Sequence, residues 1–153
     1  MSTSPTACLN NAALLAGLVL GLVSACLVSA QDAPTRSVWD GVYTQEQAAR
    51  GQSLYGKECA GCHGQALSGG EEAPPLSGGA FLANWNGLTV GDLFERIRVS
   101  MPEGRPGTLS RQQNADVLAY ILSGNQFPPG KSELPKETEL VKQIKLEASR
   151  PEK

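Results

Sequence analysis

Three segments of the chain place apolar residues three and four positions apart, which is the spacing of a helix with one buried face. The predicted helices run from residue 44 to about 58, from 89 to about 99 and from 110 to 123. Each begins at a Ser or Thr that can cap a helix, and a glutamine three residues after Thr44 and after Ser110 completes a capping-box pattern. No segment shows the alternation of a strand, so the pattern predicts a small, loop-rich, all-α domain. The apolar faces of the second and third helices comprise Leu93, Phe94, Ile97, Val117, Leu118, Ile121 and Leu122.

Two other regions carry weaker patterns. Residues 64–79 hold five glycines and a Pro-Pro pair, which predicts a loop that has no core of its own and must wrap around something. Residues 136–148 place Leu140, Val141 and Ile144 at helical spacing, which fits either a short docked helix or a frayed tail. Between these regions, further apolar contacts are expected from Phe81, Leu82, Trp85 and Leu88.

Two glycines are interpreted by their position. Gly51 lies four residues before Tyr55 on the first helix, so both share one face. It either allows a second backbone to approach closely or is tolerated at a cost of roughly 1 kcal/mol relative to alanine. Gly124 follows the third helix, where glycine commonly serves as the C′ residue that ends a helix.

The N-terminal 30 residues have the composition of an export signal. Residues 1–31 contain no charged side chain, and an apolar run over 12–23 is followed by small residues that end at Ala30. The absence of Lys and Arg from residues 1–11 is atypical of such a signal. Two alternatives stay open: a lipoprotein signal with Cys26 as the lipidated residue, or an uncut anchor over residues 12–30.

Removal of residues 1–30 would leave an N-terminal arm (31–43) with Trp39 and Tyr43 as anchors, a domain (44–130) and a C-terminal extension (131–153). The 13 basic and 15 acidic residues are well mixed, which argues against nucleic-acid binding. Only two cysteines remain, and in an oxidising compartment such a pair becomes a disulfide or is consumed by a cofactor.

These two cysteines lie in Cys59-Ala60-Gly61-Cys62-His63, the C-x-x-C-H pattern of covalent haem attachment. The two thiols can form thioethers with one porphyrin, and the adjacent imidazole can occupy an axial position on the iron. A zinc site would need about four ligands, which residues 31–153 supply only with carboxylates. A thioredoxin-like site would require a βαβ setting, which the helical pattern does not offer.

The region from residue 44 to 127 resembles the class I cytochrome c family. The resemblance rests on a helix with Gly51 and Tyr55, the C-x-x-C-H motif, Met101 followed by proline, and a closing helix around Tyr120. It implies a small all-α fold of three main helices and loops wrapped around one covalently bound haem c. It also implies that the first and last helices cross closely at Gly51, between the two tyrosines.

The same resemblance implies roles for individual residues. Cys59 and Cys62 would bind haem covalently, and His63 and Met101 would ligate the iron; the alternative for Met101 is a core methionine. Pro74 or Pro75, with Pro75 preferred, would provide the carbonyl that orients the imidazole, or both are plain loop formers. Trp85 would donate a hydrogen bond to a haem propionate or be a core aromatic residue. Arg105 would also bind a propionate or be an exposed loop residue.

The function implied by this resemblance is single-electron transfer in the periplasm rather than enzymatic catalysis. A narrower likeness to cytochromes that accompany quinoprotein dehydrogenases suggests such an enzyme as electron donor and an oxidase or another cytochrome as acceptor. One alternative is a haem enzyme or a gas or peroxide sensor with a labile Met101, for which Glu103 and Arg105 are the nearest polar candidates. Another is a permanently bound cytochrome subunit of a dehydrogenase, docked through residues 131–153. A membrane would be involved only through a lipid at Cys26 or an uncut leader.

Overall fold

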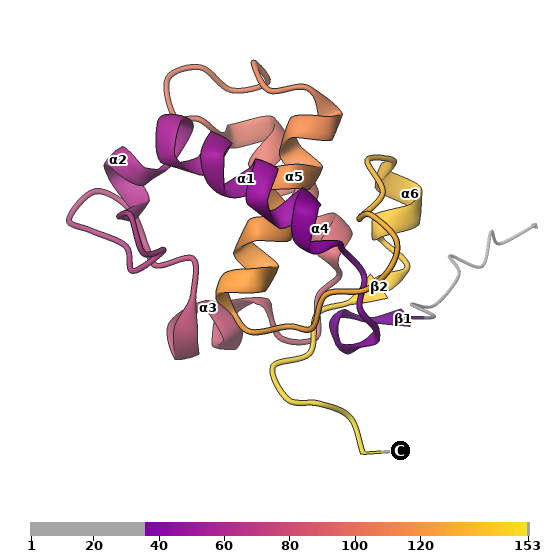
Figure 1. The fold of residues 1–153 in the computed structure, drawn as a ribbon. Helices are drawn as coiled ribbons and strands as arrows, with labels where there is room; N and C mark the ends of the chain where they lie inside the picture. Colours follow the sequence, from indigo (N-terminus) through magenta and orange to yellow (C-terminus); the bar gives the residue numbers. More distant parts are fainter. Residues whose placement is uncertain (1–35, 153) are drawn as a thin grey trace, which may run out of the picture. The chain divides into compact units, whose positions relative to one another are not determined.

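The computed structural model describes residues 36–152, which belong to one compact unit. In chain order its elements are β1 (Arg36–Ser37), the 3₁₀ turn η1 (Val38–Asp40), α1 (Gln45–Glu58), α2 (Ala60–His63), α3 (Gly78–Trp85), α4 (Val90–Ser100), α5 (Arg111–Gly124), α6 (Thr138–Val141) and β2 (Ile144–Lys145) (Figure 1). Helices dominate, which confirms the predicted all-α class. Within 36–152, no helix combines the length and the apolar character that crossing a bilayer requires. The predicted export signal and Cys26 lie outside the described residues.

The three main predicted helices are present as α1, α4 and α5, and each begins one residue after its predicted cap. Thr89 and Ser110 form complete capping boxes. Thr44 accepts a hydrogen bond from the Gln47 amide, but the Gln47 side chain turns away to the backbone of Leu134. The predicted capping box at Thr44 is therefore only half formed, because a buried backbone segment competes for the same side chain.

Helices α1 and α5 cross in close contact (Figure 1), and the contacts of Gly51 place it at the crossing. A Cβ atom added to Gly51 would stand 1.8 Å from the backbone oxygen of Asp116 and 3.0 Å from the Cβ of Tyr120. Beside this contact the rings of Tyr55 and Tyr120 lie 5.2 Å apart at an angle of 54°. The close-approach interpretation of Gly51 is confirmed, because no side chain fits between the two backbones.

The prediction for Gly124 is wrong. It is the last residue of α5, and Asn125, with φ of −93°, caps the helix instead. A Cβ atom on Gly124 would stand 2.2 Å from Cδ1 of Leu67, a buried residue of the loop 64–77. Glycine here leaves space for the Leu67 side chain and does not supply the left-handed conformation of a helix end.

Helix α3 is absent from the predicted set. The glycine-rich composition of the loop extends into its first two residues, Gly78 and Gly79, which are poor helix formers. Its sequence nevertheless carries a helical signal, since buried Phe81 and half-buried Trp85 lie one turn apart. The short helix brings both aromatic residues to the wall of one cavity.

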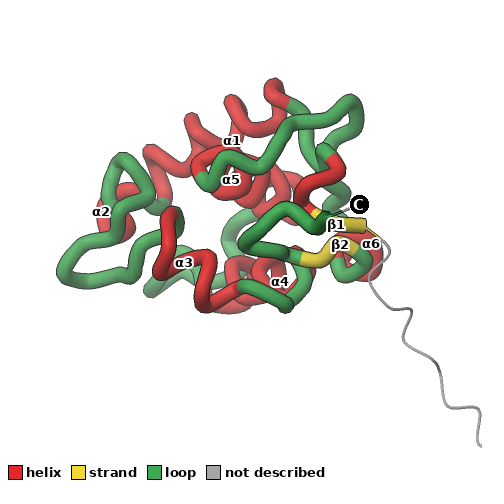
Figure 2. Tube along the Cα trace, turned by 90° about the horizontal axis from the view of Figure 1, so that it is seen from below, coloured by secondary structure: helices red, strands yellow, loops and turns green. Residues whose placement is uncertain are grey.

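The C-terminal extension folds back onto the domain. Strand β2 pairs in parallel with β1, and Val141, Ile144 and Leu146 are buried. The segment lies so close to α4 that a Cβ on Gly91 would meet the backbone of Lys142 at 2.8 Å. The docked alternative is therefore correct, although the helical part covers only Thr138–Val141. Both views place β1, β2 and α6 at the end away from α2 and α3 (Figure 2).

Polar contacts tie the extension to its neighbours. The Trp39 indole in the N-terminal arm donates to the Glu147 carbonyl at 3.0 Å, and its ring meets that of Phe127 edge-on at 4.9 Å. The Thr138 hydroxyl donates to the Glu95 carboxylate at 2.6 Å. Hydrogen bonds from Arg98 and Thr138 lower the pKa of Glu95 to about 2. The arm and the extension are thus held by directional contacts as well as by apolar burial.

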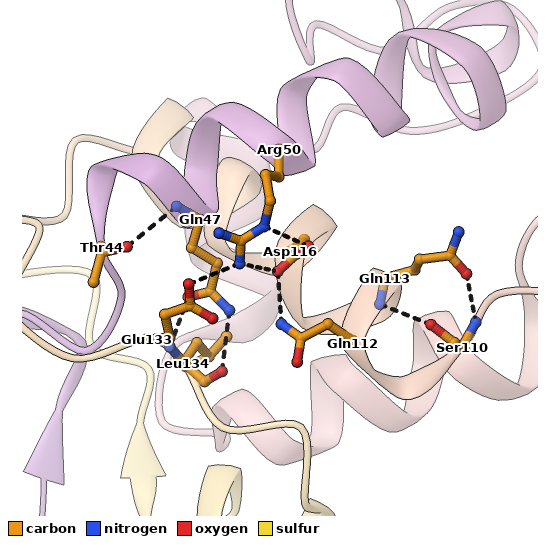
Figure 3. Close-up of polar contacts among 9 residues, drawn as sticks. All are labelled: Thr44, Gln47, Arg50, Ser110, Gln112, Gln113, Asp116, Glu133 and Leu134. Atoms are coloured by element: carbon orange, nitrogen blue, oxygen red, sulfur yellow. Dashed lines mark hydrogen bonds and ion pairs between the residues drawn. The ribbon is translucent and has the colours of Figure 1, made fainter.

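Gln47 links α1 to the start of the extension (Figure 3). Its buried amide donates to the Leu134 carbonyl at 3.1 Å and accepts from the Leu134 amide at 2.6 Å. One turn on, Arg50 donates to Asp116 at 3.0 and 3.1 Å and to Glu133 at 2.8 Å. Gln47 therefore satisfies both backbone hydrogen-bonding groups of Leu134.

Replacing Gln47 with alanine should lower the free energy of unfolding by about 2–4 kcal/mol, because it leaves a buried N–H and a buried C=O without partners. Gln52→Ala is the matched control, since Gln52 lies exposed on the same helix, and should change stability by less than about 0.5 kcal/mol. The measurement is denaturant unfolding of the haem-loaded protein. An equal effect of both substitutions would show that the hydrogen bonds to Leu134 do not stabilise the fold.

Candidate cofactor site

A cavity of about 220 Å³ lies between α2, the loop 64–77, α3, α4 and α5. Its wall is largely apolar. The predicted site residues Cys59, Cys62, His63, Met101, Trp85 and Pro75 all line it. Their side chains come from four segments up to 42 residues apart in the chain, from 59 to 101, so the fold brings together what the sequence motifs separate.

The two cysteines are positioned by a sharp change of helix direction. Cys59 ends α1 and starts α2, and its carbonyl accepts hydrogen bonds from the amides of Cys62 and His63. This single turn places both thiols on the cavity wall. Burial, with a smaller effect of neighbouring Glu58, raises the pKa of Cys59 to about 11. The thiol of half-buried Cys62 donates to Glu72, and this hydrogen bond raises the pKa of Cys62 as well. Both sulfurs are therefore kept protonated near neutral pH.

The His63 imidazole is fixed by one hydrogen bond. Its Nδ1 lies 2.8 Å from the carbonyl oxygen of Pro74. A carbonyl only accepts, so Nδ1 carries the proton and Nε2 keeps its lone pair free for a metal. The orienting carbonyl belongs to Pro74, the other of the two predicted candidates, and both prolines line the cavity. The preference for Pro75 is corrected, because the carbonyl within hydrogen-bond distance of the imidazole is that of Pro74.

Met101 reaches the same cavity from the C-terminal end of α4. It caps the helix in an extended conformation, and its amide donates to the Ile97 carbonyl at 2.9 Å. Pro102 follows and is buried. The half-buried methionine is packed against the core but also borders the cavity. It is the only methionine among the described residues, so the cavity has one thioether donor.

Trp85 is a partly buried cavity residue. Its ring lies 6.3 Å from that of Phe81 with an interplanar angle of 36°, and no hydrogen bond joins its indole N–H to another described residue. Phe81 itself is fully buried. The indole therefore remains available to an acceptor inside the cavity, and the ring also serves as a packing residue.

One charged cavity residue is missing from the sequence prediction. Arg96 of α4 is the only cation on the cavity wall, and within residues 36–152 it forms no ion pair or side-chain hydrogen bond. No pattern in the sequence signals it, since Arg96 is exposed and its position in the helical pattern is that of a solvent-facing charge. Arg105, by contrast, does not line the cavity and pairs with Glu58. The exposed-loop interpretation of Arg105 is therefore the correct one.

These residues fit a covalently attached haem. The macrocycle is apolar and its two propionates are anionic, so its site needs an apolar wall, two thiols, an axial ligand and a donor at one edge. The apolar wall is formed by Leu76, Phe81, Leu93, Ile97, Val117 and Ile121. The thiols and a lone pair on nitrogen are present, and Arg96, Asn84 and the Trp85 indole provide donors. No group of three or more His, Cys, Asp or Glu residues within 36–152 could hold a bare metal ion.

Comparison with known proteins agrees with this site. Residues 46–121 match the family model for subunit III of cbb3-type cytochrome c oxidase. The chain is 32% identical over 93 residues to the cbb3-type cytochrome c oxidase subunit CcoP of Azospirillum brasilense, covering 51% of this chain and 31% of that one. It thus spans about a third of the length of this curated relative. A chain of the sulfane dehydrogenase SoxCD from Paracoccus pantotrophus shows a TM-score of 0.43 and 24% identity, over 58% of this chain and 53% of that chain.

The matched segment contains the C-x-x-C-H motif, Met101 and nearly all of the helices that border the cavity. Motif, cavity chemistry and helix arrangement lead to one conclusion. The chain belongs to the class I cytochrome c family, whose members bind haem c covalently and transfer electrons.

Proposed function

We propose that this chain carries single electrons in the periplasm as a monohaem cytochrome with His63 and Met101 as axial ligands. The observation that carries the proposal is the convergence of four side chains, Cys59, Cys62, His63 and Met101, on one cavity. The tautomer of His63 adds to it, because the bond to Pro74 leaves the coordinating nitrogen free.

Haem, when bound, supplies an iron that cycles between the ferric and ferrous states. The protein's part is to hold it in a fixed environment. His63 is oriented by a backbone carbonyl, and a thioether from Met101 favours the ferrous state and raises the reduction potential. With His63 and Met101 holding the iron, a substrate would bind to the iron only by displacing Met101. This arrangement supports electron transfer over catalysis.

The proposed compartment rests on residues 1–30 and on the cysteine content. An export signal would deliver the domain to the periplasm, where thioether formation consumes Cys59 and Cys62. Mass spectrometry of the mature N-terminus distinguishes cleavage before Gln31 from lipidation at Cys26 and from an uncut Met1. Each of the last two results would place the domain at a membrane.

Redox proteins are the proposed partners. The relative named as an oxidase subunit supports an acceptor on the oxidase side, and a quinoprotein dehydrogenase is the proposed donor. Permanent docking through the extension is less well supported, because Leu134, Val141, Ile144 and Leu146 are buried in the chain's own core. Reduction of the ferric protein by a purified dehydrogenase, followed by stopped-flow, tests the donor.

The test of the proposed function is the visible spectrum of the purified protein in both oxidation states. The ferric form should show the weak sulfur-to-iron charge-transfer band in the far red, and the ferrous form should not bind CO rapidly. A ferric spectrum without that band, or fast CO binding, would favour the alternative of an enzyme or sensor with a labile Met101.

Replacing Met101 with histidine should lower the reduction potential by a few tenths of a volt, within the range of roughly 0.8 V that axial ligands span. A second imidazole stabilises ferric iron relative to a thioether, while haem stays attached through the cysteines. The measurement is a potentiometric titration, with loss of the far-red band as a second readout. An unchanged potential would mean that Met101 does not ligate the iron.

A further inference from the structure

Residues 103–108, in the loop that follows Met101, form one side-chain hydrogen bond to another part of the described chain. Residues 103–108 are all exposed, and Gly104 and Gly107 adopt left-handed conformations with open space around them. Inside the loop, the Arg105 amide donates to the Pro102 carbonyl at 3.0 Å, and the Thr108 hydroxyl donates to the Arg105 carbonyl at 2.9 Å. These bonds shape the loop but do not attach it to a neighbouring element.

The connection is an ion pair between Arg105 and Glu58. Nη2 of Arg105 lies 2.8 Å from Oε2 of Glu58, which is the last residue of α1 and directly precedes Cys59. Among the described residues, this is the single side-chain hydrogen bond from 103–108 to another part of the chain. It joins segments 47 positions apart. The pair therefore links the segment that carries the cysteines and histidine to the segment that carries the methionine.

The two partners differ in exposure. Glu58 lines the cavity and its side chain is 24% exposed, whereas the Arg105 side chain is 60% exposed and lies outside the cavity. An ion pair with one partly buried carboxylate is better ordered than a typical surface ion pair, but dissolved salt still screens the attraction between its charges. The pair lies beside the cavity, since Met101, Pro102 and Glu103 line the same cavity as Glu58.

We propose that the Glu58–Arg105 ion pair is a latch that holds the Met101 loop against the end of α1 and so limits how often the methionine sulfur leaves the iron. The inference rests on the proposed His63 and Met101 ligation. Met101 has its backbone fixed on one side by α4, while the chain on its other side is fixed to α1 only through Arg105. Opening the pair frees the loop, and the sulfur can then move away. Arg105 and Glu58 are positioning residues, because neither is proposed to touch the iron.

The test is the binding of imidazole to the ferric haem-loaded protein, followed by stopped-flow at saturating imidazole. Under these conditions the limiting rate reports the opening of the methionine–iron bond. Arg105→Gln and Glu58→Gln should each raise this rate by about two- to fivefold, the range of an ion pair with a partly buried member. Because each substitution breaks the same contact, the double variant should open no faster than either single variant. In the wild-type protein, salt near 1 M should raise the rate toward that of Arg105→Gln.

The control is Glu133→Gln, which removes an ion pair of the same 2.8 Å length, between Arg50 and Glu133, neither of which lines the cavity. It should leave the opening rate unchanged. Glu58→Gln also removes a negative charge from the C-terminus of α1, and this change stabilises the helix. A faster opening rate in this variant therefore cannot come from general destabilisation of the fold. Unchanged rates in both latch variants, or multiplicative effects in the double variant, would overturn the latch alone. A wild-type protein without the far-red band would overturn the proposed ligation and the latch together.

Discussion

Replacing Cys59 and Cys62 together with alanine should leave the purified protein without covalently attached haem. Both thiols line the cavity, and residues 31–153 contain no other cysteine that could form a thioether. The expected readout is the loss of haem staining after denaturing electrophoresis and of the haem mass from the intact protein.

The two single variants serve as controls for this prediction. Cys59→Ala and Cys62→Ala each retain one sulfur on the cavity wall. Each should therefore keep haem through one thioether, at reduced yield and with a shifted absorption maximum of the ferrous form. Haem staining that survives in the double variant would contradict the attachment site.

Replacing Gly51 with alanine should prevent the native crossing of α1 and α5. The new Cβ would stand 1.8 Å from the Asp116 oxygen and 2.5 Å from its carbonyl carbon, and a backbone cannot yield as a flexible side chain does. We expect a loss of at least about 4 kcal/mol in the free energy of unfolding, at the upper end for single substitutions. The measurement is denaturant unfolding, or the yield of haem-loaded protein where folding fails.

Gly56→Ala is the matched control on the same helix. A Cβ at Gly56 meets nothing within 4 Å, so this variant should gain about 0.5–1 kcal/mol from the better helix propensity of alanine. The two glycine substitutions should therefore change stability in opposite directions. Destabilisation of both variants to the same extent would show that the helix crossing does not depend on the missing side chain at Gly51.

Local patterns in the sequence were sufficient for much of this fold. Helical spacing and capping residues predicted α1, α4 and α5 to within a residue at each start, because caps are formed by side chains adjacent to the helix. The convergence of Cys59, His63 and Met101 on one cavity also agrees with the expectation from the family resemblance. These features depend on short-range chemistry or on a motif with fixed spacing.

The features that the sequence did not predict share a different cause, which is contact between residues far apart in the chain. Gln47 has the right position for a capping box, but its amide bonds to Leu134, 87 residues away. Gly124 looks like a helix end, but Leu67 lies against it. Arg96 looks like a solvent-facing charge on an amphipathic helix, but the cavity opens beside it. No local pattern reports these partners, because each is decided by the path of a distant loop.

The pairing of β1 with β2 decides where a tether can be joined to the domain without covering the cavity. Arg36 and Ser37 of β1 lie opposite Ile144 and Lys145 of β2 in the parallel pair. Both strands lie at the end away from α2 and α3, two of the elements that border the cavity (Figures 1 and 2). The chain beyond Lys145 runs past the end of α3, where the Ala148 amide donates to Asn86. A tether joined before β1, whether lipid, linker or electrode, would therefore leave the α2 and α3 side of the cavity free to meet a redox partner, and a tether joined at the C-terminal end would not be equivalent.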